Sequence, residues 1–168
     1  MGGGAIMRVA SFFINNQTKK VNMGLDMYAC SVDEEMHNGL QASYLAEDQE
    51  LPESTFYWRK HSKLHQFMQD YYYECVSDGI IVEPENRQEE MPMGTFNCVP
   101  LHLPIDKIKE LHDLVKTNNL PDSQGGLFFG HQFQDQAAKE EKKKDLKFCR
   151  WAKDETKNGN FVYYSCWF

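Results

Sequence analysis

Two segments of the chain alternate apolar and polar residues, a pattern typical of strands that bury one face. They are residues 24–30, near the start, and residues 161–167, at the end. Three shorter extended segments are predicted at residues 55–57, 96–103 and 127–129. Pro100 places the second of these at the edge of a sheet, because proline has no N–H to donate to a neighbouring strand.

Three longer segments repeat apolar residues at steps of three and four, which predicts amphipathic helices. The first runs from residue 58 to residue 75, the second begins at Pro104, and the third covers residues 132–156. The lysine-rich part of the third helix, residues 139–144, is predicted to be exposed. The acidic segment between the first two strands, residues 33–54, is predicted to be a loop, with a short helix near residues 40–46.

The strands are short and their connections to the helices are irregular. This combination predicts an α+β fold: a single domain with a small mixed or antiparallel sheet and about three helices packed on one face. The domain is expected to span residues 23–168. Residues 1–22 open with three glycines and contain a polar run, so we expect a flexible N-terminal extension; an ordered strand is the alternative.

The chain of 168 residues has a formal net charge of −7, and residues 21–58 contain neither lysine nor arginine. This balance argues against binding to duplex nucleic acid. No apolar run approaches the length of a membrane span, so we expect no membrane contact and a cytoplasmic location. The five cysteines are widely spaced and form no CxxC pair, which predicts free thiols and no zinc site.

Several short motifs occur in the order found in a family of phage and bacterial proteins of unknown function. The chain resembles that family in its Met-Gly-Leu-Asp-Met-Tyr string at residues 23–28 and its Tyr-Trp-Arg-Lys string at residues 57–60. Residues 98–115 resemble the family's cysteine and strand followed by a helix. Residues 120–130 resemble a Leu-Pro segment that ends in Gly-Phe-Phe-Phe-Gly, with Leu127 at the first Phe. Residues 161–167 match its aromatic end loosely. The resemblance implies a small, often phage-encoded protein.

The first candidate site is the segment Tyr57-Trp58-Arg59-Lys60-His61, at a junction between a strand and a helix. Unpaired N–H groups and the helix dipole favour an anion there, and a guanidinium can bind phosphate or carboxylate with two hydrogen bonds. The alternative is a structural role, in which Trp58 belongs to the core and Arg59 pairs with a carboxylate such as Asp26.

The second candidate site is the glycine-rich segment at residues 123–131. The backbone N–H groups of Gln124, Gly125 and Gly126 are candidates for binding a phosphate, with His131 just beyond. The pattern matches neither a P-loop nor a dinucleotide-binding motif. A turn before a buried strand is the alternative interpretation.

We expect these segments to face one cleft, together with the aromatic end of the chain. The spacing of His61 and His65 suits metal ligands, but HExxH is absent, and we expect no metal and no cofactor. The predicted ligand-binding residues are Asp26, Tyr57, Trp58, Arg59, Lys60, His61, Gln124, Gly125, Gly126, His131 and Tyr164.

No catalytic constellation can be assembled from the spacing. The sequence therefore favours a binding module that acts on a host protein or sequesters a small anionic, nucleotide-like ligand. The alternative is a small enzyme for a phosphorylated or nucleotide substrate, with Asp26, His61 or His131 as acid or base.

Overall fold

The structure is a computed structural model that describes residues 24–42, 51–85, 87, 94–125 and 129–168. Four predictions therefore lie wholly or partly outside the described residues: the extension at residues 1–22, residues 43–46 of the short helix, the phosphate contact of Gly126, and the first two residues of the strand at 127–129. Phe129 itself is described, and it has a 3-10 helical rather than a strand conformation.

Four strands form one antiparallel sheet in the order β2-β1-β4-β3. They are β1 (Asp26–Val32), β2 (Phe56–Arg59), β3 (Leu101–Leu103) and β4 (Phe161–Trp167). The two segments with the clearest alternation, β1 and β4, pair along their whole length and form the centre of the sheet. The short β3 lies at an edge, as the proline before it predicts.

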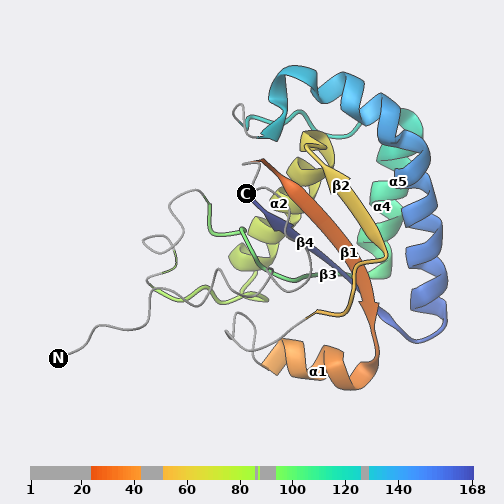
Figure 1. The fold of residues 1–168 in the computed structure, drawn as a ribbon. Coiled ribbons are helices and arrows are strands. Elements are labelled where there is room, and N and C mark those ends of the chain that lie inside the picture. The colour runs from red at the N-terminus through yellow and green to blue at the C-terminus, as the bar shows by residue number, and fades with distance from the viewer. Residues whose placement is uncertain (1–23, 43–50, 86, 88–93, 126–128) are drawn as a thin grey trace.

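Three helices pack on one face of this sheet and bury the main core. They are α2 (Ser62–Ser77), α4 (Ile105–Thr117) and α5 (Gln134–Lys157), and α5 follows a 3-10 turn, η3 (His131–Phe133). Figure 1 shows α2 crossing the strands, with α4 and α5 side by side along the right of the molecule. Alternate residues of every strand point into this layer, among them Met27, Trp58, Leu101, Val162 and Tyr164. The α+β prediction, with three helices on one face, is confirmed.

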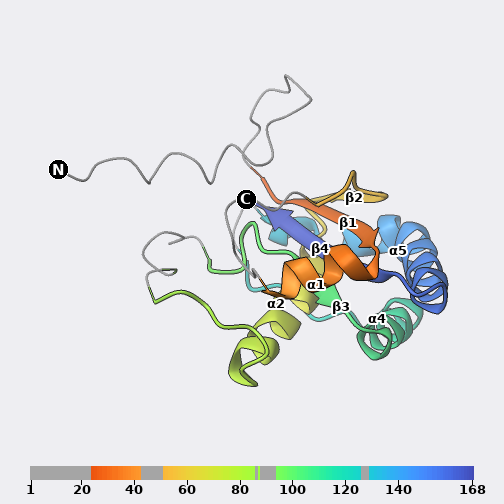
Figure 2. The same cartoon turned by 90° about the horizontal axis from the view of Figure 1, so that it is seen from below.

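A fourth helix, α1 (Glu34–Ala42), lies against the opposite face of the sheet, so the prediction of a loop over residues 33–54 was wrong at its start. The carboxylate of Asp33 caps the helix by accepting the N–H of Met36 at 2.9 Å, and two glutamates follow in its first turn. Leu40 packs on the strand residues Cys30, Val32 and Tyr163. Figures 1 and 2 both place α1 at the end of β1.

The predicted strand over residues 96–103 is a strand only at its end, because residues 95–98 form a turn. Phe96 is still buried in the main core. The side chain of Asn97 takes the place of a strand partner: its Nδ2 donates to the carbonyl of Phe168 at 2.9 Å and its Oδ1 accepts the N–H of Phe168 at 3.0 Å. These two hydrogen bonds hold the last residue of the chain beside Phe96.

All five cysteines are free thiols, as the spacing predicts, and four of them are buried. Burial raises the pKa of Cys30 and Cys98 to about 11, so these sulfurs stay protonated at neutral pH. Within the described part of the chain, no helix is long and apolar enough to cross a membrane.

Candidate functional site

The first predicted cluster is divided between the core and the opposite face of the sheet. Trp58 and His61 are fully buried, and both bind the carboxylate of Asp145 on α5. Trp58 Nε1 donates to Oδ1 at 2.8 Å, and His61 Nε2 lies 2.8 Å from Oδ2. The other ring nitrogen of His61 accepts the N–H of Leu64 at 3.5 Å, so Nε2 carries the proton that Asp145 accepts. Both residues therefore join β2 and α2 to α5 and cannot contact a ligand.

The other face of β2 carries the ion pair that we weighed as the structural alternative. Arg59 Nη1 lies 3.1 Å from Asp26 Oδ1, and the hydroxyl of Tyr57 donates to the same oxygen at 2.5 Å. Asp26 and Arg59 are paired residues of neighbouring strands, so their side chains project from the same face. Burial and then the Asp26 charge raise the pKa of the adjacent Tyr28 to about 12. The ion pair with Asp26 that the structural interpretation of Arg59 predicts is therefore present.

We expect Arg59→Lys to lower the free energy of unfolding by less than about 1 kcal/mol, because Arg59 is 38% exposed and water screens its attraction to Asp26. Asp26→Asn should cost more, since the Asp26 side chain is 10% exposed and serves two donors. Urea denaturation of both variants measures the two effects. A larger loss from Arg59→Lys than from Asp26→Asn would show that the arginine is the more important partner.

Lys60 and His131 are exposed, and neither lines the pocket that is described below. Lys60 has a φ of 54° and turns the chain from β2 into α2. Gly130 packs closely on it, because a Cβ at Gly130 would lie 3.0 Å from both Cβ and the carbonyl oxygen of Lys60. His131 is exposed, with Nδ1 3.4 Å from the side-chain nitrogen of Gln134. The close approach of Gly130 to Lys60 explains why a glycine precedes η3.

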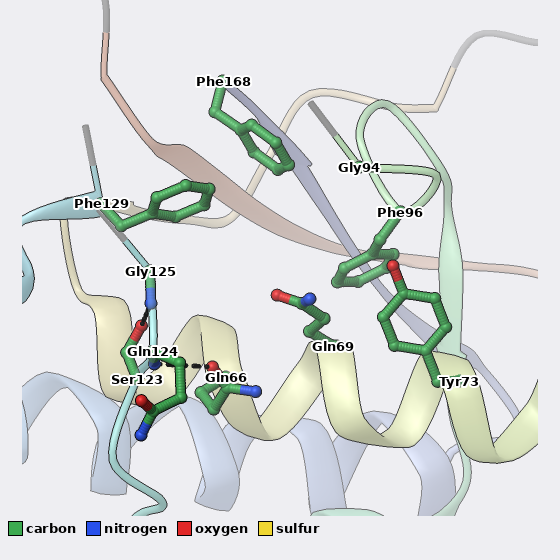
Figure 3. A pocket seen from close by; sticks show the side chains of 10 residues that line it. All are labelled: Gln66, Gln69, Tyr73, Gly94, Phe96, Ser123, Gln124, Gly125, Phe129 and Phe168. Atoms are coloured by element: carbon green, nitrogen blue, oxygen red, sulfur yellow. Dashed lines mark hydrogen bonds between the residues drawn. The ribbon is translucent and has the colours of Figure 1, made fainter. Parts of the chain in front are cut away.

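A pocket is formed between α2, the segment at residues 123–125 and Phe168 (Figure 3). It has a volume of about 280 Å³. None of the side chains that line it among the described residues is charged. They are Gln66, Gln69, Tyr73, Gly94, Phe96, Ser123, Gln124, Gly125, Phe129 and Phe168.

Aromatic rings form one wall of the pocket. The rings of Phe129 and Phe168 are 4.8 Å apart between centroids, and both are partly exposed. Gly125 allows Phe129 to approach, because a Cβ there would lie 2.8 Å from Cγ of the ring. At Gly94 a Cβ would lie 3.5 Å from the Phe168 ring, an ordinary van der Waals contact, so the φ of 141° rather than space favours glycine there. Gly125 therefore gives the Phe129 ring room, which is a different role from the phosphate contact predicted for it.

The N–H groups of residues 123–125 are already used, which argues against phosphate binding by this part of the segment. Ser123 N–H donates to Gln134 Oε1 at 2.8 Å, Gln124 N–H to Gln66 Oε1 at 3.4 Å, and Gly125 N–H to Ser123 Oγ at 3.0 Å. Lys63 fixes the segment as well, because its Nζ lies 2.7 Å from Asp122 Oδ1. The segment therefore forms one wall of the pocket and is held in place by these hydrogen bonds and by the ion pair.

Gln69 has no hydrogen-bond partner among the described residues. Its amide rises from α2 into the space between Phe129 and Phe168 on one side and Phe96 and Tyr73 on the other (Figure 3). The neighbouring Gln66 is held in place, with Nε2 donating to Asp70 at 2.8 Å. A free amide offers a ligand one hydrogen-bond acceptor and two donors beside the aromatic wall.

His65 lies directly behind that wall. Its ring stacks on Phe96 and Phe129, with centroids 5.6 and 5.5 Å away, and meets the edge of Phe168 at 5.5 Å. Nδ1 lies 3.0 Å from the hydroxyl of Tyr164, whereas Nε2 is buried and has no hydrogen-bond partner among the described residues. Burial lowers the pKa of His65 to about 3, so the ring is neutral at physiological pH.

The predicted site residues therefore do not share one cleft. Of the eleven, only Gln124 and Gly125 line the pocket, Gly126 is not described, and Tyr164 is fully buried behind His65. The sequence analysis missed the pocket residues on α2. Their signal is the spacing of Gln66, Gln69 and Tyr73, which puts two amides and a ring on one side of the helix.

Comparisons of the chain with protein-family models, with curated proteins and with solved structures found no match.

Proposed function

We propose that this chain is a binding module for a small, planar, polar ligand, and that the ligand is the base of a nucleoside or nucleotide. The observation that carries the proposal is the unpaired amide of Gln69, which points into a pocket walled by Phe129 and Phe168. Each base has a flat face that stacks on an aromatic ring and an edge that hydrogen-bonds to an amide.

The size and charge of the pocket support a base rather than a phosphate group. Its volume of about 280 Å³ is just below the range of ligand pockets, which begins near 300 Å³, so it suits a small group such as a single base. The lining side chains are neutral, and the N–H groups of residues 123–125 are occupied. The phosphate of a bound nucleotide would extend from the pocket mouth into solvent. The sequence predicts an anionic, nucleotide-like ligand. We propose that the pocket binds such a ligand through its uncharged base and not through its phosphate.

An enzymatic role has less support than binding. The three candidate acids or bases are not available in the pocket. Asp26 pairs with Arg59 and Tyr57 on the face of the sheet opposite α2. His61 is buried against Asp145, and His131 does not line the pocket. General acid or base catalysis needs such a group within hydrogen-bond reach of the ligand. The resemblance to phage and bacterial proteins adds the proposal that sequestering the ligand acts on a host cell.

We expect at least one of adenosine, guanosine, cytidine and uridine to shift the side-chain amide signals of Gln66 and Gln69 in proton–nitrogen NMR spectra. Gln69→Leu should weaken this binding about tenfold, because it keeps the size of the side chain and removes its hydrogen bonds. Gln136→Leu on the exposed face of α5 is the matched control and should leave the affinity unchanged.

Two results would contradict the proposal. In the first, none of the four nucleosides shifts any signal of the pocket at millimolar concentration. In the second, a nucleoside binds but shifts signals elsewhere, and Gln69→Leu and Gln136→Leu bind it equally well.

A further inference from the structure

We infer that His65 is a second specificity-determining residue of this pocket, whose unpaired Nε2 hydrogen-bonds to a neutral polar group on the buried edge of the ligand. The inference rests on the proposed function and extends it, because it says which chemical group the deep end of the pocket recognises. It starts from His65 Nε2, which is buried and has no hydrogen-bond partner among the described residues.

A buried ring nitrogen without a partner is costly. Most buried polar side-chain atoms in folded proteins have a hydrogen-bond partner, and leaving one without a partner destabilises the fold. Among the described residues only two buried side-chain atoms are unpaired, Ser62 Oγ and His65 Nε2. Three of the aromatic rings that line the pocket, those of Phe96, Phe129 and Phe168, pack on His65, so the imidazole lies directly behind the pocket wall.

The surroundings of Nε2 show how a ligand reaches it. Phe96 is fixed in the core, whereas Phe129 and Phe168 are partly exposed. A change of side-chain rotamer in either of these two rings, which is common on binding, opens the way from the pocket to the imidazole. The Tyr164 hydroxyl, 3.0 Å from Nδ1, holds the ring in its plane while this happens.

The chemistry of the imidazole defines the ligand group. The ring is neutral, so it brings no positive charge to attract phosphate or carboxylate, and it accepts or donates a single hydrogen bond through Nε2. A ring N–H, an exocyclic amine or a carbonyl of a base supplies the complementary atom. Gln69 and His65 would then read two positions on one heterocycle, one near the mouth of the pocket and one at its floor.

The test uses the unmodified protein and two variants. In the unmodified protein, labelled with nitrogen-15 in histidine, the nucleoside that binds among adenosine, guanosine, cytidine and uridine should shift the Nε2 signal of His65 and leave that of the exposed His131 unchanged. His65→Phe combined with Tyr164→Phe removes both partners of the internal hydrogen bond and should fold. The double variant should bind the same nucleoside about tenfold more weakly. Tyr164→Phe alone keeps the imidazole and its Nε2 atom, and it should weaken the binding less than the double variant does.

The outcomes separate the two proposals. If the wild type binds a nucleoside in the pocket but the Nε2 signal does not move, or the double variant binds equally well, His65 is a structural residue and only the proposed function stands. If the wild type binds none of the four nucleosides, both proposals are wrong.

Discussion

Asp145→Ala should lower the free energy of unfolding by about 3–5 kcal/mol, a large part of the stability of a domain of this size. The carboxylate is fully buried and is the partner of two buried donors, Trp58 Nε1 and His61 Nε2. Removing it leaves both N–H groups without a partner and opens a cavity where β2, α2 and α5 meet. Urea denaturation followed by tryptophan fluorescence measures the loss directly.

Asp154, on the exposed side of the same helix, provides a matched control. Its carboxylate is 69% exposed and pairs only with Lys157. Asp154→Ala should change the stability by less than about 0.5 kcal/mol. Equal effects of the two substitutions would mean that the Asp145 contacts contribute nothing beyond those of a surface residue.

The protein should also lose stability in mild acid, and His65 should account for a large share of the loss. Burial lowers the pKa of this histidine from 6.5 to about 3, so between these values the unfolded chain binds a proton that the folded chain does not. Stability therefore falls as the pH drops below about 6.5 and levels off near the folded pKa. The His65 contribution to the loss between about pH 7 and about pH 5 is about 2 kcal/mol.

His102 acts in the same direction, because burial and then the nearby His37 lower its pKa to about 4. The share of His65 is isolated by comparing the wild type with the variant that carries His65→Phe and Tyr164→Phe. Urea denaturation at both pH values should show a decrease that is about 2 kcal/mol smaller in the variant. Identical decreases would show that His65 is already protonated in the folded protein or is exposed to solvent.

The helix α5 shows where prediction from the sequence succeeds and where it fails. Its apolar residues at 148, 149 and 152 predict the buried stripe correctly, because the period of 3.6 depends only on local geometry. Asp145 lies on the same stripe, three residues before Phe148, yet a carboxylate in a lysine-rich segment is normally exposed. Its burial depends on Trp58 and His61, more than eighty residues away in the sequence.

The pocket, too, depends on contacts between distant residues that the sequence pattern does not predict. The sequence marks Arg59 and the glycines at 125 and 126 as unusual, but it does not reveal which face of the sheet a strand residue occupies. The pairing of β1 with β2 puts Arg59 on the face opposite α2, where it meets Asp26. Gln69 looks like an ordinary helix residue, and only the approach of Phe129 and Phe168 makes it a candidate ligand contact.

By itself, the sequence determined the α+β class, the central strands, the three core helices, the edge position of the proline-preceded strand and the free state of the thiols. Each of these follows from local periodicity, backbone chemistry or the spacing of one residue type. The tertiary structure decided the strand order, the helix on the second face, the partners of the buried Asp145 and the place of the pocket. These depend on contacts between residues far apart in the chain, whose free energies are set by burial and by hydrogen-bond geometry.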